Sequence, residues 1–256
     1  MKKTFILIDF DGIIRIGKKI ADDAKSFLTF LKDKEIPHYI ISNSTLNTSK
    51  DIQLFLKKNG INFDVNAMTT VDAALQYLKK NKLKISVYCE DTIKNLFKDF
   101  IADTNPDAVV IGDIGKGWSY EVLNKIFQTV MDGADIIALQ KNKFWNPGGK
   151  GLVLDAGAFI SAIEYATSKQ SILIGKPSEI YFKSALYKLG YKYGDKFIMV
   201  GDDLETDIKG SQEINGLGIL VFTGKTKFPL TDNTSIKPAY TAKNLTDVIK
   251  IIKNVT

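Results

Sequence analysis

The sequence predicts an α/β protein in which a doubly wound parallel sheet carries a smaller inserted α/β domain. Short apolar runs rich in β-branched residues alternate with amphipathic stretches along the 256 residues, and most of these runs end in a polar or glycine-containing turn. Such alternation favours a parallel sheet that helices cover on both faces. A single core stops growing near ~250 residues, so this length suits one large domain or two smaller ones.

The chain begins with a strand, a helix, a second strand and a second helix. Apolar runs at 5–9 and 38–42 predict two buried strands. Between them, the segment 21–31 has the period of an amphipathic helix. Its apolar face consists of Phe27, Leu28 and Leu31. The next helix carries apolar residues within 52–56 and is expected to end near Gly60.

The middle of the chain has strand signals of its own, at 85–88, 108–111 and 136–139. We interpret this part as an inserted domain over residues 82–170, which interrupts a core made of residues 1–81 and 171–256. Apolar runs return after the insertion, and the larger sheet is expected to resume there. These runs lie at 171–174, 197–200 and 217–221.

The balance of charge limits the partners. Lysine and arginine number 35 and aspartate and glutamate 29, which gives a net charge of +6. The excess is spread along the chain, and no dense basic block with interleaved aromatic residues marks a nucleic-acid surface. We therefore expect no nucleic-acid partner and a solvated lysine surface whose mild positive charge helps to steer anionic substrates.

Cysteine and histidine occur once each, at Cys89 and His38. A disulfide scaffold and a Cys/His zinc site are therefore excluded, and any metal must be held by oxygen ligands. Asp9 and Asp11 interrupt the first apolar stretch too early for a signal peptide, and no segment reaches the ~20 apolar residues of a membrane span. We expect a cytoplasmic protein without a membrane partner.

The most informative motif is Asp9-Phe10-Asp11-Gly12, which follows the first predicted strand. Residues i and i+2 of a strand point the same way, so both carboxylates can face one site while Phe10 turns into the core. Two anions this close need a cation, and Gly12 permits a tight backbone approach to a small anion. Taken alone, the motif is equally compatible with an Asp-rich turn.

Two further polar groups also follow predicted strands. Ser42 and Asn43 precede a helix, where a hydroxyl and backbone N–H groups either bind an anion or cap the helix. Lys176 precedes Pro177, which disfavours helix at the lysine and leaves its ammonium at the end of a strand. A merely solvated lysine is the alternative.

An acidic cluster follows the strand predicted at 197–200. It consists of Asp202, Asp203 and Asp207. Either a turn with a helix cap or a site for a hard cation explains this density of carboxylates. All these polar groups follow strands, and ligands of open α/β sheets bind in the crevice outside the carboxyl ends of the strands.

The order and spacing of these groups resemble the haloacid dehalogenase superfamily of phosphohydrolases over essentially the whole chain. The matching motifs are Asp9-Phe10-Asp11-Gly12, Ser42, Lys176, and Gly201-Asp202-Asp203 with Asp207. The insertion resembles the α/β cap of the branch that contains 4-nitrophenyl phosphatases, phosphoglycolate phosphatase and pyridoxal phosphatase. Within that branch, segments 151–157 and 175–178 are most similar to phospholysine phosphohistidine inorganic pyrophosphate phosphatase. The resemblance implies a Rossmann-like core with an inserted cap.

The resemblance also implies a Mg²⁺-dependent phosphatase that acts on small phosphorylated substrates. Asp9 would attack phosphorus and form an aspartyl phosphate, a covalent intermediate that divides the reaction into two steps. Asp11 would protonate the leaving oxygen and then take a proton from the water that hydrolyses the intermediate. Pyrophosphate, phosphohistidine and phospholysine are the substrates that the closest resemblance suggests.

The remaining site residues are implied in the same way. The Mg²⁺ ligands would be Asp9, Asp202 and the backbone carbonyl of Asp11, with Asp203 and Asp207 in support. The groups expected to bind the phosphoryl oxygens are Gly12, Ser42, the amide of Asn43, and Lys176. Relatives often carry other residues at the positions of Ile13 and Ser42. Ile13 still offers its backbone and Ser42 still offers a hydroxyl, so no group that the reaction needs is missing.

The cap of this superfamily presents a loop to the substrate, here expected within 141–155. We expect Trp145 or Asn146 to touch the leaving group, although aromatic residues at this place also suit the core of the cap. Caps of this type often take part in dimer contacts, so a homodimer through the cap is expected as well.

Several alternatives stay open at this point. Asp11 and the composition argue against the dehalogenases and the transport ATPases of the superfamily. A phosphomutase or phosphotransferase on the same core remains compatible with the motifs, as does a non-catalytic phosphate-binding regulatory protein. The motifs do not distinguish among C–O–P, P–O–P and N–P bonds.

Overall fold

The computed structural model describes residues 3–145, 151–192, 194–230 and 234–255. The chain forms two compact units, and the second is inserted into the first. The larger unit consists of Met1–Ser42, Ser49–Met68 and Lys176–Thr256, and the smaller of Asn43–Thr48 and Thr69–Gly175. Each unit has a parallel sheet and an apolar core of its own.

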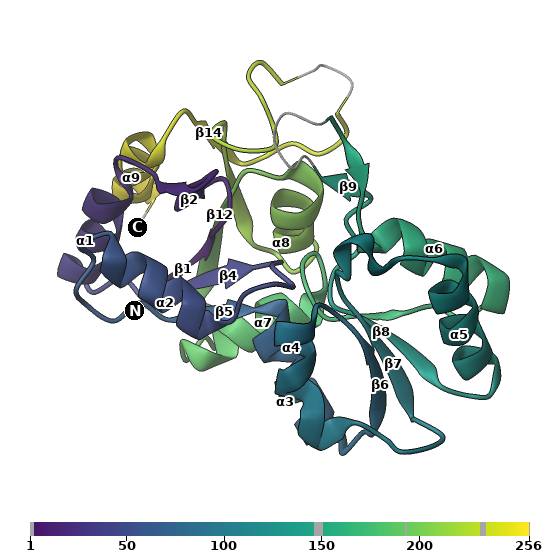
Figure 1. The fold of residues 1–256 in the computed structure, drawn as a ribbon. Coiled ribbons are helices and arrows are strands. Elements are labelled where there is room, and N and C mark those ends of the chain that lie inside the picture. The colour runs from purple at the N-terminus through teal and green to yellow at the C-terminus, as the bar shows by residue number, and fades with distance from the viewer. Residues whose placement is uncertain (1–2, 146–150, 193, 231–233, 256) are drawn as a thin grey trace. The chain divides into compact units, whose positions relative to one another are not determined.

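Among the described residues, the larger sheet has six strands in the order β14-β13-β12-β1-β4-β5 (Figure 1). Their bounds are β1 (Thr4–Asp9), β4 (His38–Ser42), β5 (Ala67–Thr69), β12 (Lys196–Gly201), β13 (Leu217–Val221) and β14 (Tyr240–Ala242). β1 pairs in parallel with both β4 and β12, and β13 joins β12 to β14 in the same direction. The chain therefore builds outward from β1 on one side and from β12 on the other, which confirms the predicted doubly wound sheet.

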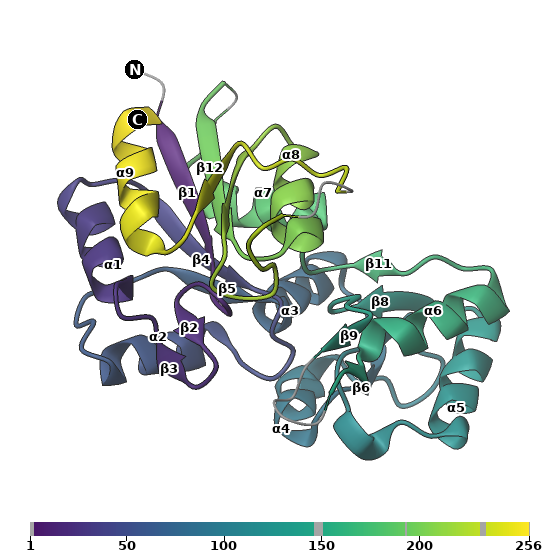
Figure 2. The same ribbon diagram turned by 90° about the horizontal axis from the view of Figure 1, so that it is seen from above.

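Helices cover both faces of this sheet. Figure 2 shows α1 and α9 on one face and α7 and α8 on the other. The helices of the unit are α1 (Ala24–Asp33), α2 (Ser49–Lys58), α7 (Glu179–Lys188), α8 (Gly210–Gln212) and α9 (Leu245–Val255). Ile6 and Ile8 of β1 pack in one apolar cluster with Phe27, Leu28 and Leu31 of α1, which confirms the face predicted for that helix.

The sheet of the smaller unit has four parallel strands in the order β11-β8-β7-β6. They are β6 (Ile85–Tyr88), β7 (Ala108–Ile111), β8 (Asp135–Ala138) and β11 (Ile172–Leu173). The helices of this unit are α3 (Thr70–Asn81), α4 (Asp91–Lys94), α5 (Tyr120–Met131) and α6 (Ala156–Thr167). Successive side chains of β7 pack on opposite sides, Val110 with α3 and α4 and Val109 with α5 and α6, which explains its unbroken apolar sequence.

The position of β11 corrects the interpretation of residues 171–174. These residues do not resume the larger sheet, because β11 pairs with β8 of the smaller one. Ile172 and Ile174 pack in the same cluster as Ile137, and a short apolar run does not encode which of two parallel sheets it joins. The smaller unit also begins before the expected residue 82, since α3 packs into that cluster.

Two further pairs of short strands are antiparallel, and the first of them is a hairpin. One joins β2 (Arg15–Ile16) to β3 (Lys19–Ile20) directly after the first motif, and the other joins β9 (Phe144–Trp145) to β10 (Val153–Leu154) in the smaller unit. Over the ranges that the structure describes, no helix combines the length and the apolarity that crossing a bilayer requires.

Candidate functional site

Four charged side chains meet at the carboxyl ends of β1 and β12. Asp9 is the last residue of β1, and Asp202 directly follows its parallel neighbour β12. The order of the sheet reverses direction between these two strands, which is where open α/β sheets bind ligands. Lys176 follows β11 in the chain, and Asp207 lies in the short helical segment Leu204–Lys209. All four residues are buried.

Lys176 lies between two carboxylates. Its Nζ donates to Asp9 Oδ1 and to Asp207 Oδ1, each at 2.6 Å. Burial by itself lowers the pKa of this ammonium, but the charges of Asp207 and Asp9 outweigh burial and raise the pKa above its ordinary value. Lys176 is therefore a fixed cation, and its burial excludes the alternative of a solvated lysine.

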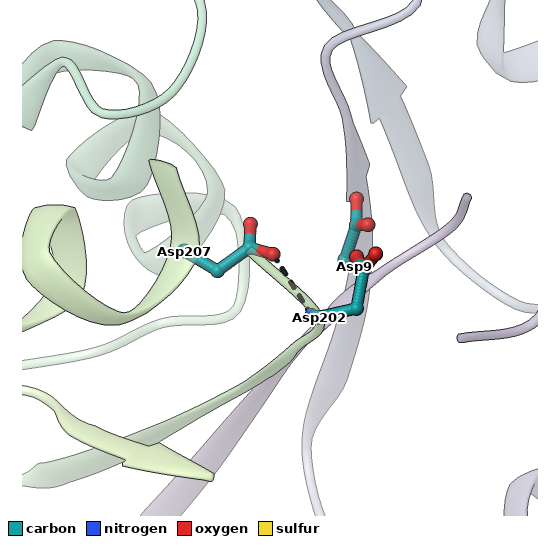
Figure 3. Close-up of side chains that lie close together, drawn as sticks. All are labelled: Asp9, Asp202 and Asp207. Atoms are coloured by element: carbon teal, nitrogen blue, oxygen red, sulfur yellow. Dashed lines mark hydrogen bonds between the residues drawn. The ribbon is translucent and has the colours of Figure 1, made fainter. Parts of the chain in front are cut away.

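Three carboxylates lie close together beside Lys176. Asp9, Asp202 and Asp207 each offer an oxygen within 4.8 Å of the other two, and Figure 3 shows the carboxylates of Asp9 and Asp202 next to each other. Burial raises the pKa of Asp9 well above its ordinary range, although Lys176 opposes this. Burial and the charge of Asp207 raise the pKa of Asp202 to about 6. The surplus of buried negative charge and the oxygen donors fit a Mg²⁺ ion.

Both carboxylate oxygens of Asp207 are already engaged. Oδ1 accepts the hydrogen bond from Lys176. Oδ2 accepts the backbone N–H of Asp202, drawn in Figure 3, and that of Asp203, each at 3.1 Å. Asp207 therefore orients Lys176 and the backbone at Asp202. The carboxylates of Asp9 and Asp202 are the ones that remain suited to a metal ion.

Sequence reasoning missed a loop that follows β13. The hydroxyl of Thr223 donates to the carbonyl of Gly12, and the backbone N–H of Lys225 donates to Asp202 Oδ2. A Cβ on Gly224 would overlap the Asp202 carboxylate. The loop thus fixes Asp202 through backbone groups, and its only sequence signal is Thr-Gly-Lys shortly after a predicted strand.

Asp203 and Asp11 have basic partners outside the buried cluster. Asp203 pairs with Lys225, whose charge lowers the pKa of Asp203 although burial raises it. Asp203 Oδ1 also accepts the N–H of Glu205 at 2.9 Å, so it caps the segment that carries Asp207. Asp11 pairs with Arg15, a residue that the sequence did not single out.

The residues expected to bind a phosphoryl group lie near the strand ends or follow them. Ser42 ends β4 and is buried, and Ile41 before it stands opposite Asp9 in the register of β4 and β1. Gly12 has φ +91°, in the left-handed region that favours glycine, and a Cβ there would overlap Asp202. Asn43 follows Ser42 in the chain but belongs to the smaller unit.

Trp145 lies in β9 of the smaller unit, where it pairs with Val153. It is 47% exposed and Phe144 is 44% exposed, so these aromatic residues do not form the core of the unit. Asn146 lies outside the described residues.

Comparisons with known proteins match both parts of the larger unit and the insertion. A family model described as haloacid dehalogenase-like hydrolase matches residues 6–100, and a second model, of HAD-like hydrolases, matches residues 173–248. Haloacid dehalogenase-like hydrolase domain-containing protein 2 from Pongo abelii is 31% identical over 236 residues, which cover 91% of this chain and 88% of that protein. Phospholysine phosphohistidine inorganic pyrophosphate phosphatase from Bos taurus is 29% identical, over 96% and 93% of the two chains.

Solved structures share the whole fold. The 4-nitrophenylphosphatase from Thermotoga maritima matches with a TM-score of 0.85 and 26% identity over 96% of both chains. The p-nitrophenyl phosphatase from Archaeoglobus fulgidus, at 23% identity, matches with a TM-score of 0.87 over 98% of this chain and 99% of that one. These matches confirm the predicted α/β architecture.

Proposed function

The chain belongs to the haloacid dehalogenase-like hydrolases, and we propose that it is a Mg²⁺-dependent phosphatase that acts on small phosphorylated substrates. One observation carries the proposal: Lys176 is buried between Asp9 and Asp207, next to Asp202, at the point where the sheet order reverses. This arrangement supports Asp9 as the candidate nucleophile, Lys176 as a fixed cation and Asp202 as a candidate metal ligand of one site.

Asp9 is the nucleophile in this proposal. Lys176 holds Oδ1 of Asp9, so Oδ2 is the oxygen that attacks phosphorus. The bond from Asp9 to phosphorus forms as the bond from phosphorus to the leaving atom breaks, which is oxygen in an ester or anhydride and nitrogen in an N–P compound. Water then hydrolyses the aspartyl phosphate and restores the carboxylate. Asp11 gives a proton to the leaving atom in the first step and takes one from water in the second.

The other groups of the site bind charge. Mg²⁺ held by Asp9, Asp202 and the backbone carbonyl of Asp11 would neutralise negative charge on the phosphoryl oxygens. In the proposal, those oxygens are bound by Lys176, Ser42, the amide of Asn43 and the loop at Gly12. Asp203 and Asp207 support this arrangement through the hydrogen bonds described above.

The relatives suggest where to look for the substrate. The bovine relative is named for phospholysine, phosphohistidine and pyrophosphate, and the bacterial structure for 4-nitrophenyl phosphate. We propose N–P and P–O–P compounds as first candidates, together with simple phosphate esters. The cytoplasmic location and the dimer through the inserted unit stay predictions.

Phosphate release from a panel of compounds tests the proposal. The panel contains 4-nitrophenyl phosphate, pyrophosphate, phosphohistidine, phospholysine, phosphoglycolate, pyridoxal phosphate and sugar phosphates, each with Mg²⁺ and with EDTA. The proposal expects release that requires Mg²⁺ and that disappears in Asp9→Asn. Transfer of phosphate to a sugar instead of water would indicate a phosphomutase, and no release from any compound would contradict the proposed function.

A further inference from the structure

Arg15 holds the carboxylate of Asp11. The Nε and Nη2 atoms of Arg15 lie 2.7 and 2.6 Å from Asp11 Oδ1. Both contacts converge on one oxygen, and in the described part of the chain Oδ2 has no hydrogen-bond partner. The side chain of Asp11 is 48% exposed, so this carboxylate is not enclosed by the protein.

The backbone between the two residues is closed into a turn. The N–H groups of Ile14 and Arg15 both donate to the carbonyl of Phe10, at 3.0 and 2.8 Å, and the N–H of Gly12 donates to the carbonyl of Arg15 at 2.7 Å. The left-handed conformation of Gly12 belongs to the same turn. The hydrogen-bonded backbone of this turn therefore brings the side chains of Asp11 and Arg15 together.

The guanidinium of Arg15 also contacts two aromatic rings. Its central carbon lies 4.8 Å from the ring centre of Phe10 and 5.9 Å from that of Phe55. The two rings pack edge to face at 5.4 Å, and Phe10 is buried. At these distances, cation–π attraction to the rings favours this position of the guanidinium. Phe55 of α2 thus helps to position the guanidinium of Arg15.

From this geometry we propose that Arg15 is a positioning residue for Asp11, which presents Oδ2 to the leaving oxygen while Arg15 holds Oδ1. The inference rests on the proposed function. In the first step the proton on Oδ2 passes to the leaving oxygen as its bond to phosphorus breaks, and in the second step Oδ2 receives a proton from water. A misplaced proton donor affects mainly those substrates whose leaving oxygen needs the proton.

A series of aryl phosphates of similar shape tests this inference. The leaving group of 4-nitrophenyl phosphate is a stable anion, whereas those of phenyl phosphate and 4-methylphenyl phosphate are more basic and need the proton. In Arg15→Met, kcat/KM should fall about 10- to 100-fold more for the basic leaving groups than for 4-nitrophenyl phosphate. Arg15→Lys should not restore the ratio, because an ammonium cannot make the two-atom contact with Oδ1, whereas added guanidinium should partly restore it in Arg15→Ala.

Lys18 of the same hairpin is exposed and provides the matched loss of one positive charge. Lys18→Met should leave the ratio between substrates unchanged. The melting temperature of Arg15→Met should change little, because partly exposed ion pairs add little to stability. If kcat/KM fell equally for all three esters in Arg15→Met, the inference would be overturned while the proposed function stood. The same holds if Lys18→Met changed the ratio of kcat/KM between the esters as Arg15→Met does. Absence of Mg²⁺-dependent hydrolysis by the unmodified protein would overturn the proposed function and the inference with it.

Discussion

The ammonium of Lys176 lies 2.6 Å from Oδ1 of Asp207, and both side chains are buried. The opposite oxygen of Asp207 accepts two backbone N–H groups. Asp207 therefore accepts hydrogen bonds on both sides, and a carboxylate can do this whereas an amide cannot. Either orientation of an asparagine would direct an NH₂ group at Lys176 or at the backbone donors.

Asp207→Asn should consequently destabilise the protein strongly, although asparagine has nearly the same size as aspartate. We expect the free energy of unfolding to fall by ~3–5 kcal/mol, as when one partner of a buried ion pair is removed. Urea unfolding at pH 7 measures this. Asp203→Asn is the control, because Asp203 pairs with a half-exposed lysine and asparagine also caps helices. Equal loss of stability in the two variants would contradict the proposed importance of the hydrogen bonds that Asp207 accepts from Lys176 and the backbone.

Gly224→Ala should weaken metal binding and leave the fold intact. A Cβ at this position would overlap the carboxylate of Asp202 and lie 2.8 Å from Cα of Gly12, so Asp202 must move. Displaced supporting groups commonly cost ~10- to 100-fold in metal affinity. The Mg²⁺ concentration that gives half-maximal activity measures the effect. Gly117→Ala is the control, since its Cβ would meet Ile114 only at ordinary contact distance, and an unchanged Mg²⁺ requirement in Gly224→Ala would contradict the role of the loop.

The sequence predicted the strands that are buried on both faces, because such strands need unbroken apolar runs, as at 108–111 and 197–200. It did not predict β5 and β14, which have three residues each and little apolar pattern. The sequence also could not show which sheet β11 joins, since two apolar residues carry no information about the strand with which they pair.

The candidate site shows a similar limit. Asp9, Lys176 and Asp202 could be singled out because chemically distinctive side chains follow predicted strands. The contribution of Gly224 could not, because it acts through the absence of a side chain. Arg15 was not singled out because its contact with Asp11 depends on the turn that brings the two side chains together.

Asp202→Asn should stabilise the protein in EDTA while it removes the effect of Mg²⁺. The pKa of Asp202 is raised to about 6, so at pH 7 the metal-free protein holds an unfavourable buried charge. We expect a rise in melting temperature of ~2–4 °C in EDTA, equivalent to ~1 kcal/mol. Mg²⁺ should stabilise the unmodified protein and not the variant. Thermal unfolding with and without Mg²⁺ decides this, and a variant that Mg²⁺ stabilises as before would exclude Asp202 as a ligand.

Trp145→Ala should change which substrates are preferred without abolishing hydrolysis. The indole is 47% exposed and contributes little to the core of its unit, so the variant should fold normally. If the ring contacts the leaving group, the ratio of kcat/KM between large and small substrates should change by about tenfold or more. Tyr120→Ala, which removes another exposed aromatic ring of the same unit, is the control. An unchanged substrate ranking in Trp145→Ala would remove this residue from the proposal.

Glu164→Gln should destabilise the smaller unit in a manner that depends on pH. The carboxylate of Glu164 accepts Lys141 Nζ at 2.7 and 2.8 Å and both the N–H and the hydroxyl of Ser171. Burial raises the pKa of Glu164, but these hydrogen bonds outweigh burial and lower the pKa below the ordinary value of 4.5. A lowered pKa means that the ionised form stabilises the fold above pH 4.5 and that this stabilisation is lost as the pH falls through the lowered pKa.

At pH 7 the variant should therefore lose ~1–3 kcal/mol, the range for hydrogen bonds to a charged group, and the difference from the unmodified protein should shrink below pH 4. Urea unfolding at several pH values measures both. Glu179→Gln removes a carboxylate that pairs with Lys183 on the surface, where both side chains are more than half exposed, and it should change stability by less than ~1 kcal/mol at either pH. A Glu164→Gln difference that stays constant from pH 7 to below pH 4 would show that packing, and not the charge of Glu164, holds this part of the unit together.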